Sequence, residues 1–127
     1  MRDLITASFI VVILIGCWLF FDSYSEKEVN ELAYTITEEI IPSIEAEAWE
    51  QGNEQLKVAE SKWDSYKTIA HLFLCASELN EIDYGMAKVI EYAEAEDVSN
   101  TSGELSALAQ QLIILNSHEK ITPENIF

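Results

Sequence analysis

Few residues in this chain have a type and spacing that could support chemistry. His71 and Cys75 stand four residues apart, which on a helix would let both side chains reach one metal ion. Two ligands do not complete a zinc site, and the surrounding run from Ile69 to Ala76 is apolar almost throughout. We therefore interpret both as packed residues. A reactive thiol is disfavoured because no lysine or arginine lies nearby in the sequence to lower the pKa of Cys75.

The clearest acidic cluster is Glu91, Glu94, Glu96 and Asp97. Carboxylate oxygens suit calcium or magnesium, but the cluster lacks the alternating acids and the turn glycine of an EF-hand loop. A solvated acidic face is the simpler interpretation.

Acid–base or nucleophilic catalysis has little support. Glu78 with Asp83 is one of many chance carboxylate pairs, and the histidines are limited to His71 and His118. The second histidine precedes Glu119 at an expected helix end, where the helix dipole favours it without any chemistry. We predict no catalytic, metal or cofactor site, and the chain is not expected to be an enzyme.

Three aromatic residues, Trp49, Trp63 and Tyr66, admit two interpretations. They could form a platform for sugars or peptidoglycan. Their three- and four-residue spacing is more typical of the buried side of a helix, so we expect them in a core.

The elements that position these residues are predicted to be helices. Apolar residues recur at three- and four-residue steps, the spacing of one helix face, in four segments of the body. The four faces are Val29, Leu32, Ala33, Ile36 and Ile40; Trp49, Gly52, Leu56, Ala59, Trp63, Tyr66, Ala70 and Phe73; Ile82, Met86, Val89 and Ala93; and Leu105, Leu108, Leu112 and Leu115.

The first boundary falls at Pro42, which should end or bend its helix, with Ser43 as the N-cap of the next. Gly52-Asn53 is expected inside that second helix because a missing side chain on the apolar face allows close approach, although a turn there remains an alternative.

The later boundaries rest on turn-forming residues. A break is expected at Ser77 to Asn80, and Ser99 to Gly103 is predicted to be a loop. Thr101 and Glu104 have the spacing of a capping box that would start the last long helix. A final turn at Thr122-Pro123 would lead to an apolar ending packed on the bundle.

No segment shows the alternation of a strand. The predicted fold class is all-α, with an N-terminal transmembrane helix followed by a small antiparallel helical bundle in residues 25–127. The apolar run from Ile69 to Ala76 is expected to be its most deeply buried part.

Residues 1–24 are predicted to form a membrane anchor. Leu4 to Phe21 gives 18 consecutive positions without a charge, or roughly 27 Å of helix, close to the minimum for one crossing of a bilayer. Arg2 precedes the run and Asp22 follows it, so the positive-inside rule places the N-terminus in the cytoplasm and the body outside. Aromatic residues gather at the outer end of the run, where headgroups favour them: Trp18, Phe20, Phe21 and Tyr24.

An alternative is a surface lipoprotein. Leu14-Ile15-Gly16-Cys17 resembles a lipobox, at which the signal would be cut and Cys17 lipidated. The single Arg2, offset by Asp3, and the apolar residues after the cysteine count against it.

The net charge of the chain excludes some classes of binding partner. Asp and Glu number 23 against 7 Lys and Arg, for a formal net charge of −16, and Arg2 is the only arginine. Nucleic acid is therefore not expected as a partner. A body of this charge should also be repelled by anionic lipid and other acidic surfaces.

The whole pattern resembles a bacterial family of small single-anchor membrane proteins, domain of unknown function DUF4363. The resemblance rests on the apolar N-terminal helix, the Trp49 to Trp63 face, Glu81-Ile82-Asp83, Glu104-Leu105 and the closing Glu124-Asn125-Ile126-Phe127. It implies an anchor and a helical fold but no activity. Where the family would have a polar residue, often histidine, two positions before Glu81, this chain has Leu79.

The predicted function is accordingly that of a membrane-anchored helical binding or scaffold protein at the cell membrane. Its expected partners are the lipid bilayer, through residues 4–21, and another membrane or surface protein. The alternative is a lipoprotein, lipidated at Cys17, that binds a small ligand or cation and would show a concave pocket.

Overall fold

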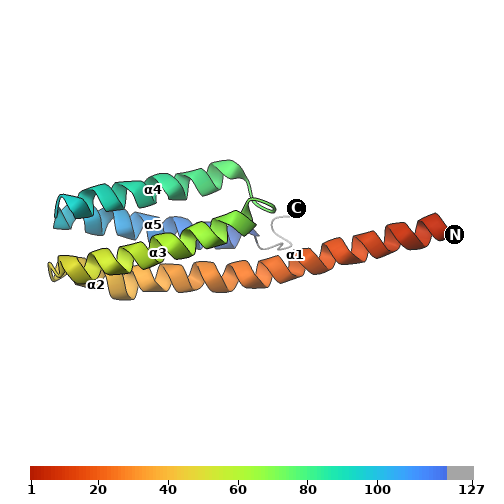
Figure 1. Cartoon of the computed structure of the whole chain (residues 1–127), viewed down its shortest axis with the longest axis horizontal. Helices are drawn as coiled ribbons and strands as arrows, with labels where there is room; N and C mark the ends of the chain where they lie inside the picture. The colour runs from red at the N-terminus through yellow and green to blue at the C-terminus, as the bar shows by residue number, and fades with distance from the viewer. Residues whose placement is uncertain (120–127) are drawn as a thin grey trace.

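The computed structural model describes residues 1–119, with side chains to Asn116. Its elements are α1 (Arg2–Thr35), a π-helical turn η1 (Ile36–Ile40), α2 (Ile41–Glu45), α3 (Trp49–Ala70), α4 (Ala76–Glu94) and α5 (Val98–Glu119). The first three form one continuous rod, and α3, α4 and α5 run back and forth beside its second half (Figure 1). Within these residues there is no strand, and the predicted all-α antiparallel bundle is confirmed.

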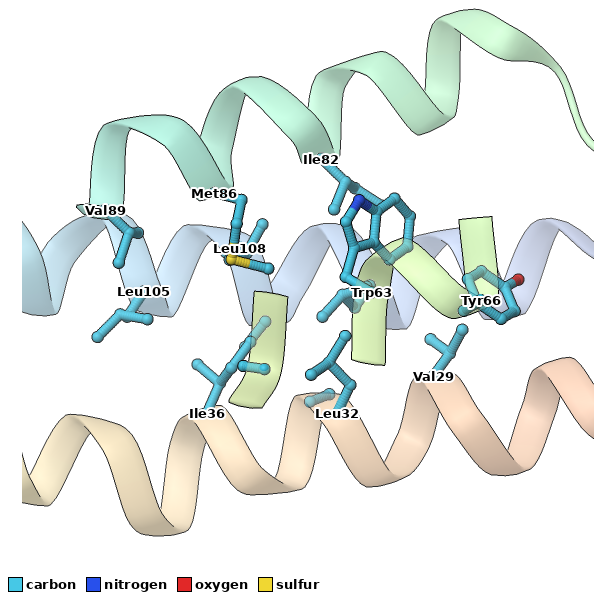
Figure 2. Close-up of a cluster of buried hydrophobic side chains, with 14 of the residues drawn as sticks. Val29, Leu32, Ile36, Trp63, Tyr66, Ile82, Met86, Val89, Leu105 and Leu108 are labelled. Atoms are coloured by element: carbon cyan, nitrogen blue, oxygen red, sulfur yellow. The ribbon is translucent and has the colours of Figure 1, made fainter. Parts of the chain in front are cut away.

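The core consists of the four apolar faces that the spacing predicts. Apart from Trp49 and Phe73, which are half-buried, every residue of these faces is buried. In Figure 2, Val29 and Leu32 from α1 and Ile36 from η1 point into the centre of the bundle, where they meet side chains from the other helices. Leu79, where the resemblance led us to expect a polar residue, is fully buried in this core.

The first predicted helix boundary is wrong. Helix continues through Pro42 to Glu45, and Ser43 is not an N-cap, because its hydroxyl donates back to the Glu39 carbonyl at 3.0 Å. The π turn directly before Pro42 provides the reason: the Ile41 N–H donates five residues back, to Ile36, which widens the helix where α-helical carbonyls would meet the proline ring. The chain reverses instead at residues 46–48, with Glu47 at a φ of 56°.

Gly52 lies inside α3, so the helical interpretation of Gly52-Asn53 is confirmed and the turn is excluded. A Cβ at this position would lie 2.8 Å from Cδ1 of Ile44. The missing side chain therefore lets α2 pack closely against the first turns of α3.

The boundary between the second and third predicted helices differs more from its predicted position. The predicted break at Ser77 to Asn80 is wrong, because α3 ends at Ala70 and α4 begins at Ala76. The apolar run from Ile69 to Ala76 thus forms the α3–α4 turn and is not the most deeply buried part of the body: Leu72 is 79% exposed. Apolar composition by itself does not tell where a chain turns.

The predicted loop from Ser99 to Gly103 is helical. The α4–α5 turn is only residues 95–97, and α5 starts at Val98. Asp97 caps it, accepting a hydrogen bond from the Asn100 N–H at 3.1 Å. Thr101 is therefore not a cap but a buried residue within α5.

The first half of α1 stands clear of the bundle (Figure 1). It provides one helix long and apolar enough to cross a membrane, and only 6% of its most apolar 18-residue window is buried. Because α1 has no break near residue 24, the division into residues 1–24 and 25–127 stays a prediction. The predicted turn at Thr122-Pro123 and the packing of the apolar ending lie outside the described residues.

Candidate functional site

An aromatic cluster joins the apolar half of α1 to the bundle. We define it as Trp18, Phe21, Tyr24, Tyr66 and Phe73. The Phe21 and Phe73 rings stack with centroids 4.3 Å apart and 12° between their planes, and Trp18 lies 6.1 Å from Phe73. Tyr66 stacks on Phe21 at 6.3 Å and on Tyr24 at 6.1 Å.

The aromatic residues that the sequence places at the membrane boundary fall into two groups, one packed in this cluster and one exposed. Phe21 is 2% exposed and belongs to the core, whereas its neighbour Phe20 is 75% exposed. The helical repeat turns Trp18, Phe21 and Tyr24 toward the bundle and leaves Phe20 outside. The ring partners on α3 and the α3–α4 turn lie far away in the chain, as Phe73 does from Phe21. The sequence therefore shows where aromatic residues gather but not which of them pack against protein.

A polar pair lies inside this cluster. The Ser25 and Tyr66 hydroxyls are 2.6 Å apart, and both residues are buried. This hydrogen bond satisfies both hydroxyls where α1 packs on α3.

Trp63 and Tyr66 are core residues, as their spacing predicts, and do not form an exposed platform. The indole N–H of Trp63 donates to Oδ1 of Asp83 at 2.7 Å. Lys67 bonds the same carboxylate, with Nζ at 3.2 and 3.1 Å from its two oxygens. Asp83 thus joins α3 to α4 through its bonds to Trp63 and Lys67.

His71 and Cys75 are both exposed and do not share a helix, so the predicted packing of this pair is wrong. Cys75 instead precedes α4, with Sγ 3.2 Å from the Ser77 hydroxyl. This hydrogen bond, and secondarily the Ser77 backbone N–H, lowers the pKa of the Cys75 thiol. In the sequence, a short polar residue such as Ser77 after the cysteine is the signal for a lowered thiol pKa, whereas the sequence analysis considered only lysine and arginine.

Acidic residues flank both of the turns that lie farthest from the N-terminus (Figure 1), with Glu45 and Glu47 at the α2–α3 turn. Glu94, Glu96 and Asp97 surround the α4–α5 turn, where Glu96 adopts a φ of 54°. Hydrogen bonds from Asn100, the backbone N–H first and the side-chain amide second, hold the pKa of the Asp97 carboxyl below its ordinary value. Among the side chains that the structure describes, which end at Asn116, no three His, Cys, Asp or Glu are grouped so that they could hold a metal ion. The side chains of His118 and Glu119 lie outside the described part.

A groove of about 540 Å³ opens beside the aromatic cluster. Its walls come from the outer end of the apolar run and from the end of α3, and they are almost entirely apolar. They comprise Ile13, Gly16, Cys17, Phe20, Phe21, Tyr24, Ile69 and Phe73. A hollow at the opposite end of the bundle has polar and apolar walls in equal measure, and three glutamates line it, Glu47, Glu50 and Glu54.

This arrangement is suited to holding an apolar surface and offers no set of converging polar groups for a reaction at the groove. One family model, described as domain of unknown function (DUF4363), matches residues 19–126. No curated protein and no solved structure matches the chain.

Proposed function

The chain belongs to the family described as domain of unknown function DUF4363, and on that premise we propose that it is a single-span membrane protein whose acidic bundle binds or scaffolds another protein outside the cytoplasm. The apolar half of α1 is the anchor. The bundle is the binding module, and it carries out no catalysis of its own.

The observation that carries this proposal is the isolation of an apolar helix. Large apolar side chains with exposed fractions of 48% or more occupy most positions from Leu4 to Leu14. Exposing this much apolar surface to water is costly, since each buried methylene is worth about 0.8 kcal/mol. A bilayer removes that cost, and helical hydrogen bonding satisfies the backbone within it.

The orientation follows from the flanking charges. Arg2 lies before the apolar run, and Asp22 and Glu26 lie after it. The positive-inside rule then puts the N-terminus in the cytoplasm and the bundle outside. This assignment is part of the proposal, as is the cell membrane as its location.

A binding or scaffold role fits the rigid continuation of α1 into the bundle. Because helix runs without interruption to Glu45, the acidic turns are held at the end farthest from the anchor. A basic protein partner would complement that end, and its capture should weaken as salt screens exposed charges beyond about 8 Å.

The lipoprotein alternative is less compatible with the aromatic cluster. Cutting before Cys17 would leave the lipidated residue directly next to Trp18, which packs on Phe73. No tether would then separate the lipid from the folded bundle.

The decisive experiment measures the intact mass of the protein extracted from its native membrane. We expect a mass that includes residues 1–16 and no acyl chains. Loss of those residues together with acylation of Cys17 would establish the lipoprotein instead.

Orientation is tested with a cysteine far from the membrane. In a Cys17→Ala, Cys75→Ala background, Ser99→Cys places the only thiol at the start of α5. A membrane-impermeant maleimide should label it in intact cells. Labelling only after lysis would reverse the proposed orientation.

The partner is sought by crosslinking in the native membrane at low and at high salt. We expect a basic protein whose recovery falls as salt rises. Recovery of the same partner at both salt concentrations would contradict the role given to the acidic end.

A further inference from the structure

We propose that the α3–α4 turn is a second membrane contact, with Ile69 to Leu74 seated at the boundary between acyl chains and headgroups of the leaflet from which α1 emerges. This inference rests on the proposed function, because it requires that α1 spans the bilayer. It adds a lipid-binding surface on the bundle itself.

Ring contacts fix the level of the turn along α1. Phe73 stacks on Phe21 at 4.3 Å and lies 6.1 Å from Trp18. Both partners belong to the last turn of the uncharged run from Leu4 to Phe21. A bilayer that covers this run therefore reaches the α3–α4 turn as well.

The outward surface at this level is apolar on both elements. Leu72 is 79% exposed and Ile69 is 42% exposed on the turn side, while Leu19 is 61% and Phe20 75% exposed on α1. An apolar surface shared by two adjacent elements, and continuous with a membrane helix, is typical of insertion at a lipid interface.

The absence of charge distinguishes the α3–α4 turn from the other two turns of the bundle. Ile69 to Cys75 contains no Asp, Glu, Lys or Arg, although the chain carries a net charge of −16. The other two turns carry Glu47 and Glu96. The α3–α4 turn itself therefore carries no acidic group that anionic lipid would repel, although Asp22 and Glu78 lie close to it in the sequence.

The apolar groove continues the same surface. Ile13, Gly16 and Phe20 form one wall, and Ile69 and Phe73 form the other. A cavity lined in this way holds water poorly. An acyl chain is the occupant that this lining and this level in the bilayer favour.

The test measures the depth of Cys75, which ends the turn. A full-length Cys17→Ala protein is labelled at Cys75 with an environment-sensitive nitrobenzoxadiazole fluorophore and reconstituted in phosphatidylcholine vesicles. Some vesicles contain lipids with a spin label near the headgroup. The matched control carries the fluorophore on Ser99→Cys, in the Cys17→Ala, Cys75→Ala background.

We expect the Cys75 fluorophore to emit at shorter wavelength than the control and to lose emission to the lipid spin label. The Ser99→Cys control should lose none. Leu72→Asp should reduce the quenching at Cys75, whereas Val58→Asp, at a half-exposed site on the middle of α3, should leave it unchanged. Circular dichroism of both variants verifies that the helices persist.

Flotation of the vesicles separates the two proposals. Protein that fails to float with lipid overturns the proposed anchor. Protein that floats but shows equal emission at Cys75 and at the control overturns the second contact alone.

Two other occupants of the turn are also tested. Energy transfer between differently labelled copies, with no lipid quenching, would assign the turn to a second copy. Quenching that arises only after deletion of residues 120–127 would assign the turn to that segment. Either result overturns lipid contact in the intact chain.

Discussion

Cys75 is the residue for which the structure differs most from the expectation based on the sequence. It lies at the N-terminal end of α4, exposed, with its sulfur 3.2 Å from the Ser77 hydroxyl. Hydrogen bonds to the sulfur favour the thiolate form of Cys75. They form because α4 begins directly after this residue, whereas the sequence predicts the break between helices at Ser77 to Asn80. The structure therefore reverses the expectation that this thiol is packed and inert.

At the residue scale, we predict that Cys75 is alkylated with a pH midpoint below that of an ordinary exposed thiol, because its pKa is lowered. Ser77→Ala should move the midpoint upward. The measurement is the rate of iodoacetamide reaction against pH, in the detergent-solubilised Cys17→Ala protein. An unchanged midpoint in Ser77→Ala would contradict the assigned cause.

Trp63 is the second residue-scale case. It is 1% exposed and bonded to Asp83, so Trp63→Ala should cost about 3–5 kcal/mol of unfolding free energy. Trp49→Ala, at a half-buried site, should cost distinctly less. Urea unfolding of the full chain in detergent compares them, and equal losses would show that the core assignment of Trp63 is mistaken.

At the scale of elements, the contact between α2 and α3 depends on a glycine. Gly52→Ala gains about 1 kcal/mol in helix propensity but places a Cβ 2.8 Å from Ile44. Because Ile44 is fully buried and cannot move freely, overpacking of about 1–3 kcal/mol should outweigh the gain.

A double-mutant cycle measures this contact. Ile44→Val removes Cδ1, so the double variant should be more stable than the sum of the two single changes predicts. Gly103→Ala, which meets nothing within 4 Å on α5, is the control and should stabilise by about 0.5–1 kcal/mol. Additive effects of the two changes would exclude the contact.

At the scale of the whole molecule, the bundle and the anchor share core residues. Phe21 belongs to the buried core and Tyr24 packs against it, so a body cut at Ser25 lacks both rings as well as Trp18. We predict that a fragment starting at Ser25 is helical but less stable, by about 3–5 kcal/mol, than one starting at Trp18. Urea unfolding of the two fragments, monitored by circular dichroism, provides the comparison, and equal stability would place Phe21 outside the folding unit.

The overall charge provides a further prediction at this scale. Millimolar calcium or magnesium should raise the melting temperature only slightly, and monovalent salt at matched ionic strength should do nearly the same, because both screen repulsion among the acids. A saturable, calcium-specific rise of many degrees requires a real site. In that case, the first residues to substitute in locating the calcium site would be Glu91, Glu94, Glu96 and Asp97.

Sequence periodicity determined the interior of this protein, because a three- and four-residue repeat directly encodes which side of a helix leaves water. The faces that contain Leu32, Leu56, Val89 and Leu108 were all predictable for that reason, and each is buried. The same repeat places Gly52 on a contact surface before any partner is known.

Only the tertiary structure determined where the helices end and which apolar residues stay outside. Ser99 to Gly103 has loop composition, yet the Asp97 cap and the burial of Thr101 hold it in helix. Leu72 and Leu79 are equally apolar, but one is 79% exposed on a turn and the other is fully buried. The hydrophobicity of a side chain indicates only that its removal from water is favourable. Whether other protein surrounds it depends on contacts such as Phe21 with Phe73, which join residues far apart in the chain and leave no local signal.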